Sequence, residues 1–222
     1  MLLVSFLLGL ISGCSYNILE KRLIKSYEEI REFKKWPFYW ITLLLGLLFM
    51  RAYQVYGLKV EVWLYMFLIW DLVFLAWFDL KYMLLPSKMI YVGLGSGIAF
   101  RLIQGIILNN YSLIINGLIG AVSGYILFLL LFYGSKWLLK KEGLGFGDVR
   151  LMALIGFFIG VELLPLMLII ASFSAVLVGA CLYVIRKQSE AFPFGPFLCI
   201  GTLLIILFQD EVIHFYLQCM GI

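Results

Sequence analysis

Stretches of about 20 mostly apolar residues follow one another along nearly the whole chain, and each is long enough to cross a bilayer core about 30 Å thick as a helix. Inside lipid, a helix satisfies its backbone polar groups within one segment. The runs therefore predict an all-α fold, a polytopic transmembrane helix bundle. About eight hydrophobic spans are expected on this length criterion, at roughly 2–19, 38–56, 62–80, 89–108, 112–133, 149–161, 163–185 and 194–209.

The composition excludes an ordinary soluble domain. Of the 222 residues, 64% are hydrophobic and 14% are charged, whereas soluble domains have about 45–50% apolar and about 25% charged residues. The four cysteines and the single histidine show no metal-ligand spacing, so no bound metal is expected. We expect one integral membrane domain over residues 1–222, with a short basic connection at about 20–37.

The basic residues predict the orientation of the bundle. Fourteen of the 17 Lys and Arg residues fall in connections on one side, at about 20–37, 81–88, 136–150 and 186–187. Cytoplasmic loops carry such an excess, so this side is predicted to be cytosolic and both termini to lie outside. The net charge of +4 is thereby explained by topology, and no nucleic-acid partner is expected.

Two features of the spans concern packing. The sixth span has only about 13 residues, near 20 Å at 1.5 Å per residue, and cannot cross the bilayer alone. Its N-terminal end is therefore expected below the membrane surface, in a cavity lined by protein. Glycines four residues apart favour close helix packing over flexible hinges; these pairs are Gly9/Gly13, Gly93/Gly97, Gly120/Gly124 and Gly156/Gly160.

Three aspartates lie within or at the ends of spans, where carboxylates are costly and indicate function by default. The predicted topology puts Asp79 and Asp148 at the cytosolic ends of their helices, where they could face each other across a cavity. Two carboxylates in one site hold a shared proton, so one can activate water while the other protonates the leaving group. The alternative is that both are solvated helix-end charges, with Asp148 favoured by the helix dipole.

The loop before Asp148 and two further charges support less definite predictions. Gly145 and Gly147 allow positive φ and close backbone approach, so an extended substrate could reach Asp148. Asp71 could tune the acidic pair, although hydrogen bonding within the bundle is the favoured interpretation. Arg101 is expected to snorkel or to pair with a buried carboxylate, for which Asp71 is a candidate.

Four segments together resemble the type IV prepilin peptidases, a family of GxGD intramembrane aspartyl proteases. In chain order they read GLISGCSYN (9–17, followed by Arg22 and Leu23), DLKYMLLP (79–86), GFGDVRLMA (145–153) and PFGPFL (193–198). The resemblance spans nearly the whole chain. It implies that Asp79 and Asp148 are the catalytic aspartates, with Gly145 and Gly147 in the active-site loop. It also implies a substrate-binding or structural role for Pro86, Pro193, Gly195 and Pro196.

The resemblance further implies the reaction. A member of this family cleaves the short basic leader from type IV pilin-like or pseudopilin precursors, after a leader glycine, in systems for pili, protein secretion and competence. Such an enzyme is a multi-pass protein of the bacterial cytoplasmic membrane, with its active site near the cytosolic face and no cofactor for cleavage. Acidic residues near the basic rim are candidates to hold the leader, namely Glu28, Glu29, Glu32 and Glu142.

The chain departs from the family's pattern in two places. Many members carry a cytosolic Cys-rich segment after the first span, whereas the connection at 20–37 contains no cysteine. S-adenosylmethionine would be needed only if the N-methyltransferase activity common in the family is retained, and weak or no such activity is predicted. Ser87 stands where an acidic residue commonly follows Pro86. The alternative functions are a small ion- or proton-coupled transporter using the intramembrane carboxylates, and a catalytically inactive assembly subunit.

Overall fold

The computed structural model describes residues 1–25, 39–139, 144–186, 192–208, 211 and 218, and the regular elements within these ranges are α-helices. This confirms the predicted all-α fold. In chain order the helices are α1 (Leu2–Cys14), α2 (Tyr16–Ile24), α3 (Tyr39–Tyr56), α4 (Glu61–Tyr82), α5 (Ser87–Leu108), α6 (Ser112–Leu139), α7 (Phe146–Arg186) and α8 (Gly195–Leu207).

The first predicted span is the one that differs most from the structure. It is bent at Ser15, and its second part, α2, continues to Ile24. The connection expected from residue 20 therefore begins later, because Glu20 belongs to α2 and is buried. The rest of that connection, with Glu28, Glu29 and Glu32, lies outside the described residues, as does Glu142.

The length and composition of the helices define a multi-pass membrane protein. Five segments are long and apolar enough to cross a membrane: Leu2–Ile24, Glu61–Tyr82, Ser87–Leu108, Ser112–Trp137 and Phe146–Val184. Gly195–Leu207 is a shorter apolar helix. The count of eight spans and the outside position of both termini stay predictions.

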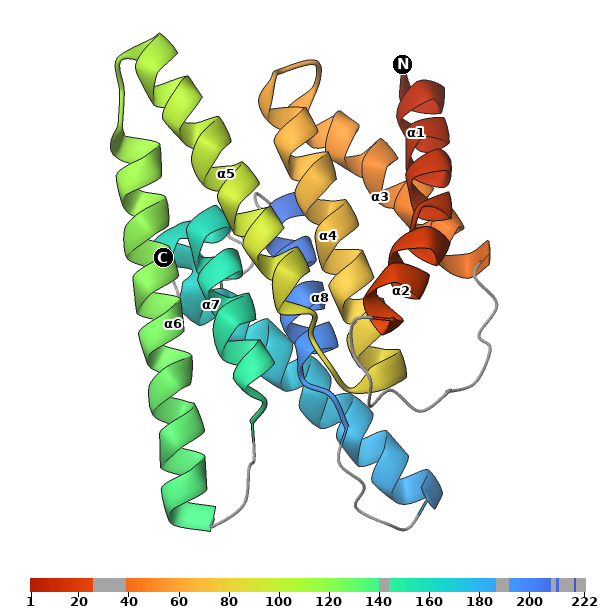
Figure 1. The fold of residues 1–222 in the computed structure, drawn as a ribbon, viewed down its shortest axis with the longest axis vertical. Coiled ribbons are helices and arrows are strands. Elements are labelled where there is room, and N and C mark those ends of the chain that lie inside the picture. Colours follow the sequence, from red (N-terminus) through yellow and green to blue (C-terminus); the bar gives the residue numbers. More distant parts are fainter. Residues whose placement is uncertain (26–38, 140–143, 187–191, 209–210, 212–217, 219–222) are drawn as a thin grey trace.

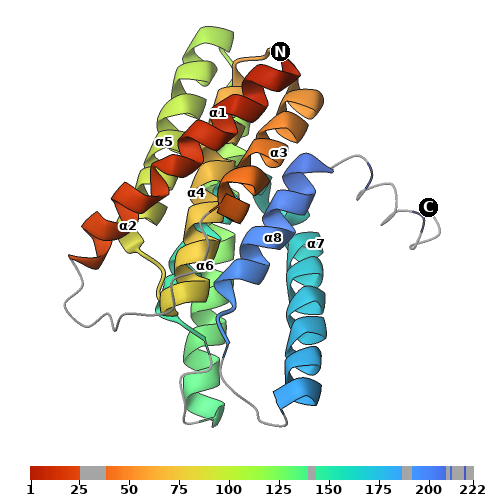
Figure 2. The same cartoon turned by 90° about the vertical axis from the view of Figure 1, so that its right-hand side faces the viewer.

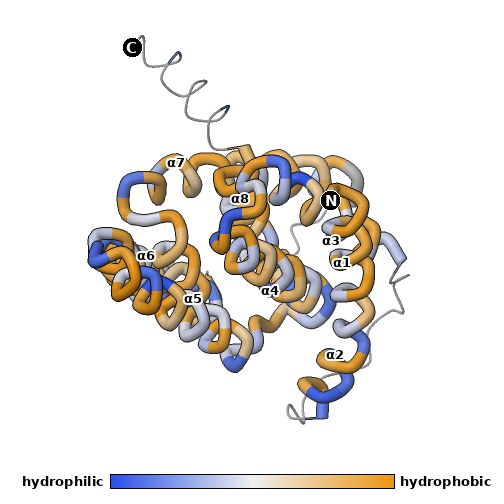
Figure 3. The backbone as a smooth tube through the Cα atoms, turned by 90° about the horizontal axis from the view of Figure 1, so that it is seen from above, coloured by the Kyte–Doolittle hydropathy of each residue, from blue (hydrophilic) through white to orange (hydrophobic). Residues whose placement is uncertain are grey.

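Helix α4 lies in the middle of the bundle. Viewed along the helices, α4 and α8 are central, α1 and α3 lie on one side, and α5 and α6 lie on the other (Figure 3). In α4, 67% of the most apolar window is buried, against 22% for Leu2–Ile24. A carboxylate on α4 is consequently surrounded by protein on most sides, whereas α1, α5 and α6 leave most of their surface outside the bundle.

Small residues bring the helices together as predicted. A Cβ added to Gly9 would lie 2.6 Å from the Cα of Gly46, so α1 and α3 touch through their backbones. Gly120 and Gly156 leave no room for a side chain on either residue, which brings α6 against α7. The close-packing interpretation is therefore confirmed at Gly9, Gly120 and Gly156.

Helix α7 is interrupted at Gly160, whose φ of 75° and ψ of 170° suit glycine alone. The chain runs up to this residue and then back down (Figures 1 and 2), so the two halves correspond to the predicted sixth and seventh spans. Arg101 of α5 donates to the carbonyls of Phe158 (3.0 Å) and Leu113 (2.9 Å) beside the break. Asp71, the candidate partner, is not paired with Arg101: the guanidinium instead bonds the Phe158 carbonyl of α7, just before the break, and the Leu113 carbonyl of α6.

Candidate active site

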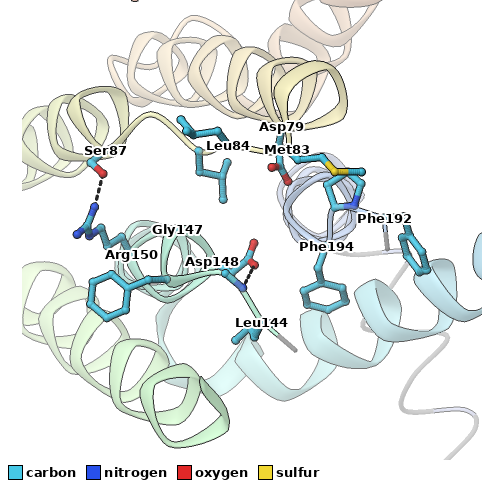
Figure 4. A pocket seen from close by; sticks show the side chains of 14 residues that line it. Asp79, Met83, Leu84, Ser87, Leu144, Gly147, Asp148, Arg150, Phe192 and Phe194 are labelled. Atoms are coloured by element: carbon cyan, nitrogen blue, oxygen red, sulfur yellow. Dashed lines mark hydrogen bonds between the residues drawn. The ribbon is translucent and has the colours of Figure 1, made fainter. Parts of the chain in front are cut away.

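A cavity of about 530 Å³ opens where α4 ends and α5, α7 and α8 begin (Figure 4). These four helix ends meet at the same end of the bundle although they are distant in the sequence. The cavity is lined by Asp79, Met83, Leu84, Leu85, Ser87, Leu144, Gly145, Phe146, Gly147, Asp148, Arg150, Phe192, Pro193 and Phe194.

Asp79 reaches the cavity from the last turn of α4 and is 5% exposed. The backbone N–H of Gly195, at the start of α8, donates to its carboxylate. A Cβ on Gly195 would lie 2.5 Å from Asp79 Oδ2, so only glycine allows this approach. Pro196 follows in the first turn of α8, where its missing N–H costs nothing, and Pro193 lines the cavity. The segment PFGPFL (193–198) thus holds the carboxylate of Asp79 in place.

Asp148 is the third residue of α7 and is 6% exposed. Its Oδ2 accepts a hydrogen bond from the Gly145 N–H (3.2 Å), and its own N–H donates to the Gly145 carbonyl (3.0 Å). This resembles half of a capping box and holds the carboxylate at the helix start. Asp148 Oδ1 is buried and has no hydrogen-bond partner within the described residues. One oxygen therefore fixes the side chain, while the other is available.

The two carboxylates share the cavity, as the predicted topology required. Figure 4 shows both side chains directed into the same space from different helices. They are close enough for the charge of Asp148 to act on Asp79. Two acids in a nearly water-excluded site can hold one proton between them and exchange it during a reaction. The arrangement supports general acid–base chemistry on a bound substrate better than it supports two solvated charges.

The loop glycines and Pro86 position the wall of the cavity. Gly145 and Gly147 allow positive φ, but among the described glycines only Gly57 and Gly160 adopt it. Close approach is confirmed for Gly147, where an added Cβ would lie 2.9 Å from the Cβ of Leu85. Pro86 is buried outside the lining and accepts the Met89 N–H (3.0 Å) at the start of α5.

Sequence reasoning missed a polar contact that holds the last turn of α4. Glu20 of α2 accepts hydrogen bonds through Oε1 from the ammonium of Lys81 and from the Tyr82 hydroxyl (2.5 Å for the latter). Lys81 and Tyr82 follow Asp79 by two and three residues, at a helix end that would otherwise fray. The contact ties α2 to the segment that aims Asp79 into the cavity.

Sequence reasoning also missed Arg150, which lines the cavity two residues after Asp148. Its guanidinium donates to Ser87 Oγ and lies 4.7 Å from the centre of the Phe146 ring. Lys81 and Arg150 each stand two residues after a site aspartate. That spacing is visible in the sequence, although their contacts with α2 and α5 are not.

Asp71 does not belong to the cavity. It is fully buried on α4, and neither carboxylate oxygen has a hydrogen-bond partner within the described residues. The predicted hydrogen bonding within the bundle is therefore wrong. Gly93 of α5 makes room for the side chain, because a Cβ there would overlap Asp71 Oδ2.

The fold and cavity define a class of protein: a multi-pass helical membrane protein with two buried acids in one cavity. The family model of the type IV leader peptidase family matches residues 65–180, just over half of the chain. The chain belongs to this family, as the four sequence segments indicated. The matched range includes both Asp79 and Asp148.

Named relatives are similar over much of the chain. The "Prepilin leader peptidase/N-methyltransferase" of Aeromonas salmonicida (strain A449) is 35% identical over 153 residues, which is 68% of this chain and 51% of that protein. Proteins with the same name from Pseudomonas putida and Legionella pneumophila are 33% and 30% identical, covering 75% and 82% of this chain and 57% and 62% of their own lengths. The chain thus spans about half the length of the first of these relatives. No solved structure matches it.

Proposed function

We propose that the chain is a membrane aspartyl endopeptidase that removes the short basic leader from type IV pilin-like precursors. The observation that carries this is the placement of Asp79 and Asp148, from different helices and 5% and 6% exposed, in one cavity. Membership of the type IV leader peptidase family and the names of the relatives support the substrate class. The cleaved bond is expected after a leader glycine, before the precursor's hydrophobic helix.

The chemistry follows from one proton shared between two acids. The ionised carboxylate accepts a proton from water, and the resulting hydroxide attacks the scissile carbonyl carbon. The protonated carboxyl donates its proton as the carbon–nitrogen bond breaks, releasing a carboxylate and an amine. The Gly195 and Gly145 N–H groups hold the two carboxylates in place. Helix starts that anchor both acids reduce the reorganisation needed during the reaction.

The active site is proposed to lie near the cytosolic face of the bacterial cytoplasmic membrane, in a single membrane domain. Lys81 lies in the last turn of α4, Lys88 in the first turn of α5 and Lys136 in the last turn of α6. An excess of basic residues is typical of cytoplasmic loops and favours anionic lipid headgroups. A transporter using the same carboxylates would need polar groups on both sides of the aspartates. In α7, the stretch beyond Asp148 is instead apolar and buried, including Leu151, Met152, Leu154 and Ile155.

S-adenosylmethionine fits the described residues poorly. Apart from the cavity of the two aspartates, a groove between α1, α3 and α4 is lined mainly by apolar and aromatic residues, including Leu8, Phe49 and Trp63. A smaller cavity of about 170 Å³ is occupied at one side by Arg101, which would repel the sulfonium charge. We therefore derive no methyl-transfer step and propose a peptidase with weak or no methyltransferase activity.

The test uses the purified chain in detergent with a synthetic pilin-like precursor peptide. We expect one cleavage, after the leader glycine, and the mass of the mature fragment, which carries the new N-terminus, identifies the bond. Added S-adenosylmethionine should leave that mass unchanged, and a 14 Da increase, the mass of one CH₂ group, would contradict the methylation part alone. No cleavage of any precursor by well-folded protein would overturn the peptidase function.

A further inference from the structure

Arg150 carries a charge that the proposed reaction does not use. It lines the same cavity as the aspartates, and its guanidinium is held between Ser87 Oγ and the ring of Phe146. An arginine has five N–H donors in a planar fork that matches a carboxylate. Within the described chain, the ion pairs join Arg51 to Glu211 and Lys81 to Glu20, so Arg150 has no carboxylate partner there.

The two aspartates do not neutralise this charge. Asp79 and Asp148 accept backbone N–H groups, from Gly195 and Gly145 respectively. Figure 4 shows Arg150 and Ser87 at one side of the cavity, with Leu84 between Ser87 and Asp79. The cavity therefore has an acidic part, where a bond can be cleaved, and a separate basic part. A bound chain passing through it would meet both.

Ser87 determines whether the basic part is available. An acidic residue at this position would pair with Arg150 and cancel its charge. Serine fixes the guanidinium through one hydrogen bond and leaves the other donors free. Since a buried or half-buried cation is costly without a partner, a ligand that supplies a carboxylate would gain from binding here.

We propose that Arg150 and Ser87 form an anion subsite that binds an acidic side chain of the precursor close to the cleaved bond. This inference rests on the proposed peptidase function and adds a substrate preference to it. A carboxylate there makes charge-assisted hydrogen bonds to the free guanidinium donors, which orients the extended precursor across the two aspartates. Arg150 is then a specificity-determining residue, and Ser87 positions it.

The experiment scans single Glu residues through a neutral pilin-like peptide, on both sides of the scissile bond, each compared with Gln at the same position. At one position, we expect kcat/KM to be about tenfold higher for Glu than for Gln, as for one charge-assisted contact. Arg150→Gln should reduce this ratio to about one, and Arg150→Glu should favour Lys at that position.

Ser87 provides an independent variant that keeps Arg150. Ser87→Asp should pair with the guanidinium and abolish the Glu preference, whereas Ser87→Asn, of similar size and uncharged, should keep it. Glu162→Gln neutralises an exposed carboxylate of α7 that does not line the cavity, and as the control it should also keep the preference. If Arg150→Gln does not fold, an unchanged ratio in Ser87→Asp overturns the subsite.

Two further outcomes separate the alternatives. Cleavage by the wild-type protein without preference at any position overturns the subsite alone, whereas no cleavage of any peptide overturns the peptidase function together with the subsite. Assays in nanodiscs of zwitterionic lipid and of anionic lipid test whether a lipid phosphate competes with the peptide for Arg150. Both lipids carry a phosphate, so a Glu preference seen in detergent but in neither kind of nanodisc would assign Arg150 to a lipid phosphate instead and overturn the proposal.

Discussion

The two ends of the first half of α7 differ in how completely their polar groups are hydrogen-bonded. At the Gly160 end, Arg101 donates to two carbonyls and lies over the rings of Phe157 and Phe158. At the other end, Asp148 has one bonded oxygen and one buried oxygen without a partner in the described chain. A satisfied charge stabilises the fold at a break in a helix. A carboxylate left incompletely bonded beside a cavity is available for chemistry.

The largest expected effect comes from removing either acid of the cavity. Asp79→Asn and Asp148→Asn keep the side-chain shape but cannot exchange the shared proton, so cleavage should fall by about 10³-fold or more. The double variant should be no worse than either single one, because the pair acts as one unit. The measurement is precursor conversion in membranes, normalised to folded protein.

Asp71→Asn is the matched control, since it changes a carboxylate of the same helix outside the cavity. It should leave cleavage unchanged. Substantial cleavage by Asp148→Asn would end the two-aspartate mechanism.

The next effect concerns the Gly160 end of this half-helix, where the contacts of Arg101 stabilise the fold. Gly160→Ala forces a side chain into a conformation that suits glycine, and the added Cβ would lie 3.2 Å from Asn116. We expect a loss of about 1–3 kcal/mol in unfolding free energy, seen as a lower midpoint of thermal unfolding in detergent.

Gly95→Ala on α5 is the control, because nothing lies within 4 Å of its added Cβ. Alanine there should be neutral or slightly stabilising in a helix. Equal stability of the Gly160 and Gly95 variants would contradict the strained break.

A smaller effect is expected at the contact of Glu20 with Lys81 and Tyr82, which holds the last turn of α4. Glu20→Gln removes the ion pair with Lys81 but keeps an acceptor for Tyr82, so the last turn of α4 should loosen. We expect kcat to fall about fivefold, the equivalent of roughly 1 kcal/mol, with little change in KM.

Exchanging the charges, with Glu20→Lys and Lys81→Glu together, should recover most of the lost kcat. Glu211→Gln breaks the exposed ion pair with Arg51, far from the cavity, and should not change kcat. A double variant that is as slow as the product of the two single effects would exclude a direct contribution of the pair.

The smallest effect separates Asp71 from the cavity acids. Asp71 has no hydrogen-bond partner in the described chain, so Asp71→Asn loses no such contact. The free energy of unfolding should change by no more than about 1 kcal/mol, and it could rise because a buried acid is removed. The measurement is the midpoint of thermal unfolding in detergent. A large destabilisation of Asp71→Asn, relative to Asp79→Asn, would show that Asp71 has a partner in the folded protein.

The sequence predicted the helices well because apolar runs and lipid thickness limit their positions. Both Asp79 and Asp148 were found in this way, since their positions at helix ends follow from the order of the spans. The bend at Ser15 was missed because its backbone stays helical, with φ of −66° and ψ of −22°. Periodicity cannot reveal a bend of that kind.

The contacts between helices could not be predicted from the sequence. Glu20 was expected in a solvated connection, yet it is buried against Lys81, more than 60 positions away. Asp71 was a candidate partner for Arg101 on charge alone, whereas the arginine bonds one carbonyl beside the break in α7 and one at the start of α6. Pairing of charges in lipid depends on which backbone groups are free, and that is known only once the helices are placed.

The apolar stretch between the ends of this half-helix has a consequence for the permeability of the membrane. Leu151, Met152, Leu154, Ile155 and Phe157 are each fully buried between Asp148 and Gly160. These packed apolar side chains close this part of the bundle, so water for the proposed hydrolysis would reach the two aspartates through the cavity. We expect a vesicle containing the protein to maintain its proton gradient while the acids exchange protons with one compartment. Peptide hydrolysis inside the bilayer would then proceed without dissipating the energy stored across it.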